Sequence, residues 1–475
     1  MSTKSGKPVS GTPAKQGPVI TDWRPEDKTF WASTGKSIAS RNLWISIPNL
    51  LLAFSVWMVW SMVTVKLNDV GFNFTKDELF MLTALPPLAG ATLRIFYSFM
   101  VPVVGGRRWT AITTASLIIP ALWMGFAVQN PETPYSTFVL IALLCGFGGG
   151  NFSSSMANIS FFYPKAQQGT ALGLNAGLGN LGVSVMQFLV PLVITMGIFG
   201  AMGGEPQTMM KDGVEQKVWL QNAGFVWIPF LVVCLLAAWF GMNDLASARS
   251  SFKDQAVIFG QKHTWLMCWL YIGTFGSFIG YSAGFAMLMK TQFPGIDPMK
   301  FAFLGPLVGA VIRPVGGWLS DKIGGAKVTF WNFIVMMAAV VGVLQFLPTN
   351  GEGGNFWGFF AMFIVLFVTT GIGNGSTFRM IPVIFRTQND RANAGKGKDA
   401  QDASIRKSQM ESAAVLGFSG AIGAYGGFFI PMSFGTSMSL TGGPQGALYC
   451  FIGFYMTCIF VTWWWYSRKN AEMPC

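Results

Sequence analysis

Leu93-Arg-Ile-Phe-Tyr-Ser-Phe-Met100 is an apolar stretch that carries one arginine and leads to a Gly-Gly turn. A second stretch of the same kind, Ile312-Arg-Pro-Val-Gly-Gly317, leads to a later Gly-Gly turn at Gly324-Gly325, which corresponds to Gly105-Gly106 after the first stretch. In both copies the arginine precedes the turn by 11 residues, and Arg94 and Arg313 lie 219 positions apart. The repetition predicts a chain built from two related halves.

Both arginines are predicted to lie deep in a membrane. At a rise of ~1.5 Å per helical residue, each guanidinium lies ~16 Å from its turn, near the middle of a hydrocarbon layer ~30 Å thick. A charge at that depth costs about 2.5–3.5 kcal/mol even on the lenient insertion scale, so it normally faces a polar cavity and has a function. One such arginine in each half indicates a transporter for a small anion.

The composition supports a membrane protein. Of the 475 residues, 52% are hydrophobic, 15% are aromatic and only 11% are charged, whereas a soluble protein carries about 25% charged residues. The apolar runs predict an all-α integral membrane protein with twelve transmembrane helices in two six-helix pseudo-repeat bundles. We expect the spans at 44–65, 78–101, 109–128, 136–163, 169–198, 224–242, 264–288, 300–320, 327–347, 355–385, 411–435 and 445–467.

The net charge of +12 is distributed unevenly along the chain. Most lysines and arginines fall in segments that share one side of a twelve-span protein. The positive-inside rule places this basic side, with both termini, in the cytoplasm, which predicts a multi-pass protein of the inner (plasma) membrane. The basic excess is then an orientation signal, and its expected contact is anionic lipid, not nucleic acid. The lysines expected on the opposite side are Lys66, Lys76, Lys211, Lys217, Lys290 and Lys300.

The repeat also predicts the domain organisation. A parallel repeat of six-helix units resembles the layout of the major facilitator superfamily. Gly317-Trp-Leu-Ser-Asp-Lys-Ile-Gly-Gly-Ala-Lys327 matches the loop signature of that superfamily, whereas the first-half loop, Gly105-Gly-Arg-Arg108, lacks the acidic residue. The expected segments are a cytoplasmic N-terminal segment (1–43), a six-helix bundle (44–242), a cytoplasmic linker (243–263), a second six-helix bundle (264–467) and a cytoplasmic tail (468–475).

Two glycine-rich segments form a second repeat. Residues 173–182 lead to Pro191 and residues 417–427 lead to Pro431, with an offset of 240. Glycine at this density lets helix backbones approach closely, but packing does not explain a polar Asn180 in the same stretch. The larger offset places a longer charged loop at 386–410 in the second half.

These segments resemble the two nitrate-signature segments of the bacterial nitrate/nitrite porters. The likeness rests on Gly173-Leu-Asn-Ala-Gly-Leu-Gly-Asn180 and on 420–431, and the stretches 22–26, 40–46 and 274–285 agree with it. It covers nearly the whole chain and implies that nitrate or nitrite is held by one arginine from each half, Arg94 and Arg313. The other substrate-binding positions that it implies are Asn180, Tyr271, Phe54, Phe152, Phe275, Asn175, Gly177 and Gly420.

Helical rise supports a shared layer without reference to the family. Counted from the cytoplasmic ends of their helices, the three phenylalanines and Asn180 lie ~16–18 Å deep, level with both arginines, and Tyr271 lies ~12 Å deep. A guanidinium offers paired planar donors that fit two oxygens of nitrate or nitrite. Asn180 and Tyr271 can each donate a further hydrogen bond. Phenyl rings can sandwich a planar ion, which excludes tetrahedral sulfate and phosphate.

The expected interior lacks the usual proton carriers. We place no Asp or Glu in the middle of a span, and we expect His263, the single histidine, to be solvated or interfacial at the entrance to the seventh span. Carboxylate or histidine chains are the usual intramembrane proton relays, so the sequence favours nitrate/nitrite exchange by alternating access. Because Tyr271 or a water chain can couple a proton, proton-coupled nitrate symport stays open as the alternative. An organic-anion exchanger is a further alternative.

No enzyme activity is predicted. The sequence shows no Ser/His/Asp set, no metal-binding cluster and no phosphate-cradling loop. We therefore expect no cofactor and no metal, contacts with nitrate, nitrite and membrane lipid, and a monomer. Arg379 is expected to extend its side chain to the inner membrane surface, and a role in the uptake of anions from the cytoplasm is the alternative.

Overall fold

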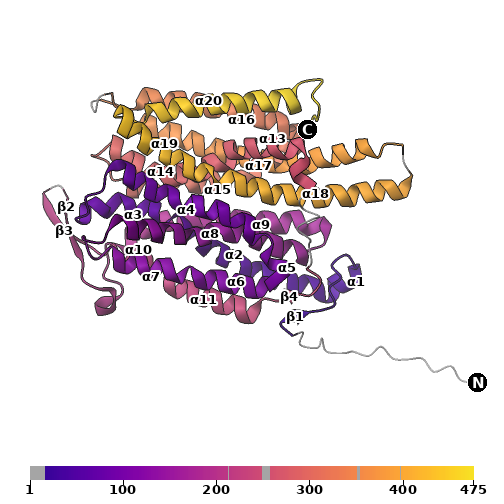
Figure 1. The fold of residues 1–475 in the computed structure, drawn as a ribbon, viewed down its shortest axis with the longest axis horizontal. Coiled ribbons are helices and arrows are strands. Elements are labelled where there is room, and N and C mark those ends of the chain that lie inside the picture. Colours follow the sequence, from indigo (N-terminus) through magenta and orange to yellow (C-terminus); the bar gives the residue numbers. More distant parts are fainter. Residues whose placement is uncertain (1–16, 212, 249–256, 350–352, 396) are drawn as a thin grey trace, which may run out of the picture.

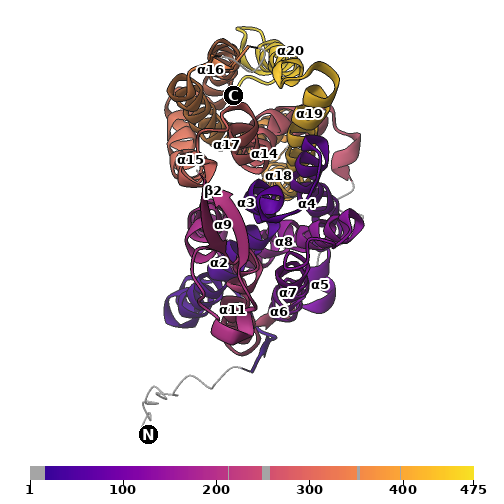
Figure 2. The same cartoon turned by 90° about the vertical axis from the view of Figure 1, so that its left-hand side faces the viewer.

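The computed structural model describes residues 17–211, 213–248, 257–349, 353–395 and 397–475. Its helices form one elongated bundle, with the first half of the chain on one side and the second half on the other (Figure 1). An end-on view shows the two halves as neighbouring lobes (Figure 2). Among the described residues, twelve helical segments are long and apolar enough to cross a membrane, which confirms the predicted number of spans.

The first half begins with a long, interrupted helix. Helical elements follow one another from Lys28 to Val70, so the first span starts well before the predicted position. The helical elements of this half are α1 (Lys28–Phe30), η1 (Trp31–Gly35), α2 (Lys36–Met58), α3 (Trp60–Leu67), η2 (Asn68–Val70), α4 (Lys76–Tyr97), α5 (Met100–Val104), α6 (Gly106–Ser116), α7 (Ile118–Ala127), α8 (Tyr135–Phe162), α9 (Lys165–Val193), η3 (Gly200–Gly203), α10 (Asn222–Phe225) and α11 (Trp227–Gly241).

The second half has the same general arrangement of spanning helices. Its first span combines α-helix and π-helix in the order α13, η5, α14. The helical elements of this half are η4 (Val257–Gly260), α13 (Lys262–Tyr271), η5 (Ile272–Gly276), α14 (Ser277–Gln292), η6 (Pro298–Lys300), α15 (Leu304–Ile323), α16 (Gly325–Phe346), α17 (Phe356–Ala392), α18 (Lys398–Ala424), α19 (Gly426–Thr441), α20 (Gln445–Thr462) and η7 (Trp463–Ser467).

Two small strand pairs mark the opposite ends of the bundle. β1 (Val19–Ile20) pairs in parallel with β4 (Asp244–Leu245), at the end where Cys475 also lies (Figure 1). β2 (Gln207–Lys211) and β3 (Val214–Val218) form an antiparallel hairpin at the other end (Figure 1). We call these the terminal end and the hairpin end.

The charged stretch 386–410, predicted as a loop, is helical. Apart from a short connection, it forms the end of α17 and the start of α18, which project together beyond the rest of the bundle (Figure 1). The loop prediction was wrong because the stretch is rich in Lys, Arg, Gln and Ala, which are strong helix formers. Gly395, with φ of 80°, lies in the short connection, where the chain turns back.

A buried carboxylate holds the first-half loop. Asp244 in β4 accepts the backbone N–H of Arg107 at 2.8 Å and pairs with the Arg107 Nε at 3.3 Å, with both side chains only 8% exposed. Gly105 has φ of 99°, and a Cβ there would lie 2.5 Å from the Asp244 Oδ1, so glycine is required. The first-half loop lacks the acidic residue of the superfamily signature. Asp244, which follows α11 in the same half, supplies a carboxylate to this loop instead.

The two halves contact each other at the hairpin end. Lys290 of α14 pairs with Asp69 of the first half, Nζ to Oδ1, at 2.6 Å, and also donates to the carbonyl of Val65. The Gln187 Nε2 of α9 donates to the carbonyl of Ser282 in α14 at 2.9 Å. These polar contacts join the first half to α14 across the interface.

Toward the terminal end the halves separate. A Cβ added to Gly169, Gly173 or Gly177, one helical turn apart on α9, would meet no atom within 4 Å. Among the described residues, no side-chain hydrogen bond or ion pair joins the halves between Arg94 and this end. The bundle is therefore closed at the hairpin end and splayed at the terminal end.

Replacing Asp244 by Asn should destabilise the first half, because the buried Arg107 guanidinium then lacks its carboxylate. Breaking a buried ion pair by removing one partner costs about 3–5 kcal/mol, so we expect a clear drop in the unfolding temperature of the purified protein in detergent. Asp22→Asn is the matched control, since the Asp22 side chain is 68% exposed and pairs with Arg24 at the surface. Equal unfolding temperatures of the two variants would contradict the role of Asp244.

Candidate functional site

Arg94 lies in the last turn of α4 and is completely buried. Its Nε donates to the carbonyl of Gly149 in α8 at 2.9 Å, and its Nη1 donates to the carbonyl of Gly420 in α18 at 2.7 Å. The second bond crosses from the first half to the second. The Nη2 atom is buried and has no hydrogen-bond partner among the described residues, so one edge of the guanidinium is available to a ligand.

Three aromatic rings surround the same guanidinium. Its Cζ lies 4.7 Å from the ring centroid of Phe152, 5.1 Å from that of Phe275 and 5.2 Å from that of Trp57. The Phe152 and Phe275 rings are stacked across the two halves, with centroids 6.3 Å apart and planes 26° apart. Phe54 contacts Phe152 edge-on at 6.1 Å. Ring faces carry negative charge and stabilise a cation placed over them.

Arg313 occupies α15 and is held by fewer contacts. Its Cζ lies 5.3 Å from the ring centroid of Phe378, and it lies near the side chain of Tyr271. Its Nη1 is buried without a hydrogen-bond partner among the described residues. Arg94 lies within electrostatic reach of both Arg313 and Tyr271. In the described part of the chain no carboxylate pairs with either arginine, so the centre of the bundle is strongly cationic.

A π-helical segment positions two of the aromatic residues. Tyr271 ends α13, and Phe275 lies in η5 immediately after it. Their rings stack with centroids 5.4 Å apart and planes 24° apart. Gly423 of α18 lets them approach closely, because a Cβ there would lie 2.8 Å from the Tyr271 ring. Short π-helical segments often occur at functional sites.

The remaining predicted positions lie at the edge of this cluster or apart from it. Asn180 is buried, and its Oδ1 has no partner among the described residues, while nearby Gly182 packs against Phe54. Asn175 donates instead to the Ser155 hydroxyl at 2.8 Å. Gly177 faces open space. The residues that the structure brings together are Arg94, Arg313, Tyr271, Phe54, Phe152, Phe275 and Gly420.

Comparison with known proteins identifies the family. The family model described as Major Facilitator Superfamily matches residues 45–396. NarU, a nitrate/nitrite transporter of Escherichia coli strain K12, is 55% identical over 455 residues, which cover 95% of this chain and 97% of that protein. The chain belongs to the nitrate/nitrite porter family of the major facilitator superfamily. This porter is therefore a multi-pass membrane transporter and not an enzyme, as the sequence predicted.

More distant comparisons agree with the family and the fold. NarK2 of Thermus thermophilus, a probable nitrate/nitrite antiporter, is 42% identical over 466 residues, or 97% of the porter and 99% of that protein. A bacterial homologue of the human lysosomal transporter Spinster, solved in an inward-facing and occupied conformation, superposes with a TM-score of 0.60 at 12% identity. That match covers 90% of the porter and 96% of the solved chain, and it reflects the shared fold alone.

Three contacts of the porter's arginines escaped sequence reasoning. Trp57 lies under Arg94, Phe378 lies under Arg313, and the carbonyl of Gly149 accepts from Arg94. One signal was present for Trp57, because it follows Phe54 by about one helical turn on the same helix face. No sequence signal identifies a backbone carbonyl as a hydrogen-bond partner.

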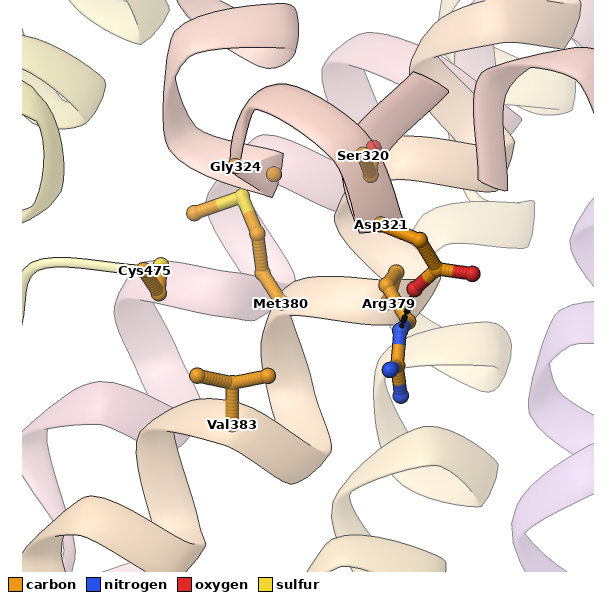
Figure 3. A pocket seen from close by; sticks show the side chains of 8 residues that line it. Ser320, Asp321, Gly324, Arg379, Met380, Val383 and Cys475 are labelled. Atoms are coloured by element: carbon orange, nitrogen blue, oxygen red, sulfur yellow. Dashed lines mark hydrogen bonds and ion pairs between the residues drawn. The ribbon is translucent and has the colours of Figure 1, made fainter. Parts of the chain in front are cut away.

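Arg379 of the porter pairs with Asp321, the acidic residue of the second-half loop signature. It is exposed at the terminal end, where a cavity of about 220 Å³ opens beside it (Figure 3). The carboxylate already neutralises the guanidinium, so this cavity offers no free cation to an anion. The residues that line it are Ser320, Asp321, Gly324, Gly325, Arg379, Met380, Val383 and Cys475.

The histidine is buried, contrary to its expected solvation. His263 is 3% exposed, its Nδ1 lies 3.0 Å from the Tyr466 hydroxyl, and its Nε2 lies 3.3 Å from Glu472. The C-terminal segment covers it, because Lys262 bonds to Glu472 at 2.6 Å. That bond lowers the pKa of Glu472 below its ordinary value. Among the described residues, no group of three His, Cys, Asp or Glu side chains could hold a metal.

Proposed function

We propose that the porter exchanges nitrate for nitrite by alternating access, with the anion bound between Arg94 and Arg313. The observation that carries the proposal is the pair of guanidiniums at the centre of the bundle. Each has a buried nitrogen without a hydrogen-bond partner among the described residues, and no described carboxylate neutralises either of them. The relatives named as nitrate/nitrite transporters support nitrate and nitrite as the substrates.

The donor set suits a flat, monovalent oxyanion. Each guanidinium presents N–H groups in one plane, which match two oxygens of nitrate or nitrite. Tyr271, which lies near Arg313, can donate a further hydrogen bond to the anion from its hydroxyl. Because Arg94 and Arg313 belong to different halves, an anion between them connects the halves through charge-assisted hydrogen bonds.

The stacked rings favour a planar ion. Phe152 and Phe275 come from opposite halves, and their centroids are 6.3 Å apart. A planar ion in contact with both ring faces needs a separation of about 7 Å, since each carbon contact takes ~3.5 Å. A small movement of the halves therefore opens a slot for nitrate, whereas tetrahedral sulfate would force the rings much further apart.

The charge at the centre favours exchange over transport in one direction. When the halves close without an anion, the two guanidiniums approach each other. Two like charges ~8 Å apart at an effective dielectric of ~20 repel by ~2 kcal/mol, which slows return of the unloaded protein ~30-fold. A bound anion cancels this repulsion, so the porter changes state efficiently when it carries nitrate in one direction and nitrite in the other.

The closed hairpin end supplies the second part of the cycle. With the cytoplasmic orientation of both termini that the basic residues predict, the splayed terminal end opens toward the cytoplasm. The ion pair between Lys290 and Asp69 then holds the outer side closed. Alternating access requires this pair to separate while the face of α9 that carries Gly169, Gly173 and Gly177 closes against the second half.

Replacement of either arginine by lysine should abolish nitrate uptake into proteoliposomes. Lysine keeps the positive charge but lacks the planar pair of donors, and it cannot hold both the anion and the carbonyl contacts of Arg94. We expect Arg94→Lys and Arg313→Lys to lose at least tenfold in uptake, since charged hydrogen bonds are worth about 1.5–3 kcal/mol each. Arg379→Lys, outside the cluster, is the matched control. Wild-type uptake by either central variant would refute the binding role.

The choice between exchange and proton symport is tested with loaded liposomes. We expect rapid nitrate uptake into liposomes that contain nitrite, and little uptake into empty liposomes under an inward proton gradient. External nitrite should compete with nitrate for uptake. Sulfate should not compete, because a tetrahedral ion does not fit between the rings of Phe152 and Phe275. Fast proton-driven uptake without an internal anion would establish symport instead, with the Tyr271 hydroxyl as the group to examine.

The ion pair between Lys290 and Asp69 is proposed as the outer gate, and cross-linking at the hairpin end tests it. Asp69→Cys combined with Lys290→Cys, bridged through two disulfides by a short bis-methanethiosulfonate, should stop nitrate/nitrite exchange, and a thiol reductant that cleaves these disulfides should restore it. The reason is that the bridge prevents the separation that alternating access requires. The wild type and each single variant, treated in the same way, control for the native cysteines. Unchanged exchange by the bridged protein would exclude a gate at this pair.

A further inference from the structure

The two central arginines are held very differently. Arg94 contacts three rings and two backbone carbonyls, whereas Arg313 contacts one ring and lies near the Tyr271 side chain. Phe152 and Phe275 are positions that the family resemblance already implies. The third ring, that of Trp57, is the contact without an assigned function.

Trp57 is completely buried and connects two parts of α4. Its indole face lies under the guanidinium of Arg94, 5.2 Å from centroid to Cζ. Its Nε1 donates to the carbonyl of Pro86 at 2.7 Å, about two turns before Arg94 on the same helix. Trp57 is therefore attached to α4 at the proline pair and supports the arginine further along.

The backbone around Trp57 is shaped for an indole. A Cβ added to Gly90 in α4 would lie 2.6 Å from the Trp57 Nε1, and one added to Gly149 in α8 would lie 2.5 Å from its Cε2. Gly149 is also the residue whose carbonyl accepts from the Arg94 Nε. The indole therefore sets the spacing of α2, α4 and α8 at the point where Arg94 is held.

In the described part of the second half no equivalent arrangement occurs. Phe278 follows Phe275 by three residues, as Trp57 follows Phe54, and it packs edge-on against Phe367 with centroids 6.4 Å apart. A phenyl ring has no N–H to donate. Arg313 is only partly buried, while Arg94 is fully buried.

We propose that Trp57 is a positioning residue for Arg94. The indole face and the bond to Pro86 hold the guanidinium so that its Nε and Nη1 bond to the two carbonyls and its Nη2 edge is directed to the anion. The inference rests on the proposed anion site and assigns different roles to its two arginines. Arg94 is the preorganised arginine, and Arg313 is the more mobile one that completes the site as the halves move.

The test compares Trp57→Phe and Trp57→Leu with the wild type. Phenylalanine keeps a ring under Arg94 but cannot donate to Pro86, and leucine removes both interactions. We expect the KM for nitrate, in exchange against internal nitrite, to rise about threefold in Trp57→Phe and about tenfold or more in Trp57→Leu. The maximal rate should change less than the KM, because the gate is intact.

Trp60→Phe is the matched control. Trp60 is also fully buried and lies one turn further along, but its ring packs against Phe138, 5.7 Å away. This variant should lower the unfolding temperature while leaving the KM unchanged. If Trp57→Leu does not fold, Trp57→Phe alone is compared with the wild type. The two quantities compared are the KM and the rise in unfolding temperature that nitrate produces, and this rise should be smaller in Trp57→Phe.

The outcomes separate this inference from the proposed function. A wild-type porter without saturable nitrate uptake would overturn both. Saturable wild-type uptake with an unchanged KM in Trp57→Phe and Trp57→Leu would overturn the positioning role alone. A KM that rises equally in Trp60→Phe would also overturn it, because general loosening of the core would then explain the effect.

Discussion

Arg94 is fully buried at the centre of the bundle, and among the described residues no carboxylate pairs with it. Two backbone carbonyls and three ring faces replace the water that a cation normally requires. Burying a charge is costly unless such partners are supplied. The glycines of α8, the packing of Trp57 and the crossing of α18 over α4 all follow from this requirement, because each one brings a partner within reach.

Three cations outside the centre have carboxylate partners. Arg107 pairs with Asp244, Arg379 pairs with Asp321, and Lys290 pairs with Asp69. The first two pairs stabilise loops within one half, and the third joins the halves at the hairpin end. These three cations are neutralised by carboxylates, whereas Arg94 and Arg313 at the proposed anion site have no carboxylate partner among the described residues. On the proposed function, a bound anion would balance the charge of these two arginines.

Sequence reasoning succeeded where a single helix carries the information. The number of spans and the placement of Arg94 and Arg313 on helices of different halves follow from hydropathy, repeat spacing and the rise of a helix. The aromatic residues near them were implied by the family resemblance, and helical rise supported their shared depth. It failed for the charged stretch 386–410, because charge alone does not separate a loop from a helix that leaves the membrane. It also misjudged His263, which is covered by a segment about 200 residues later in the chain.

The sequence by itself determined the twelve spans, because these depend on composition and on hydrophobic run length. Its motifs also determined the family, and that resemblance supplied the residues of the candidate site. Only the tertiary structure decided which partners those residues have. Asp244 reaches the first-half loop, Gly420 reaches Arg94 and Trp57 reaches Pro86 through contacts between segments 29 to 326 positions apart. Such contacts depend on how whole helices pack, and the spacing of residues along one helix contains no information about the neighbour that another helix brings.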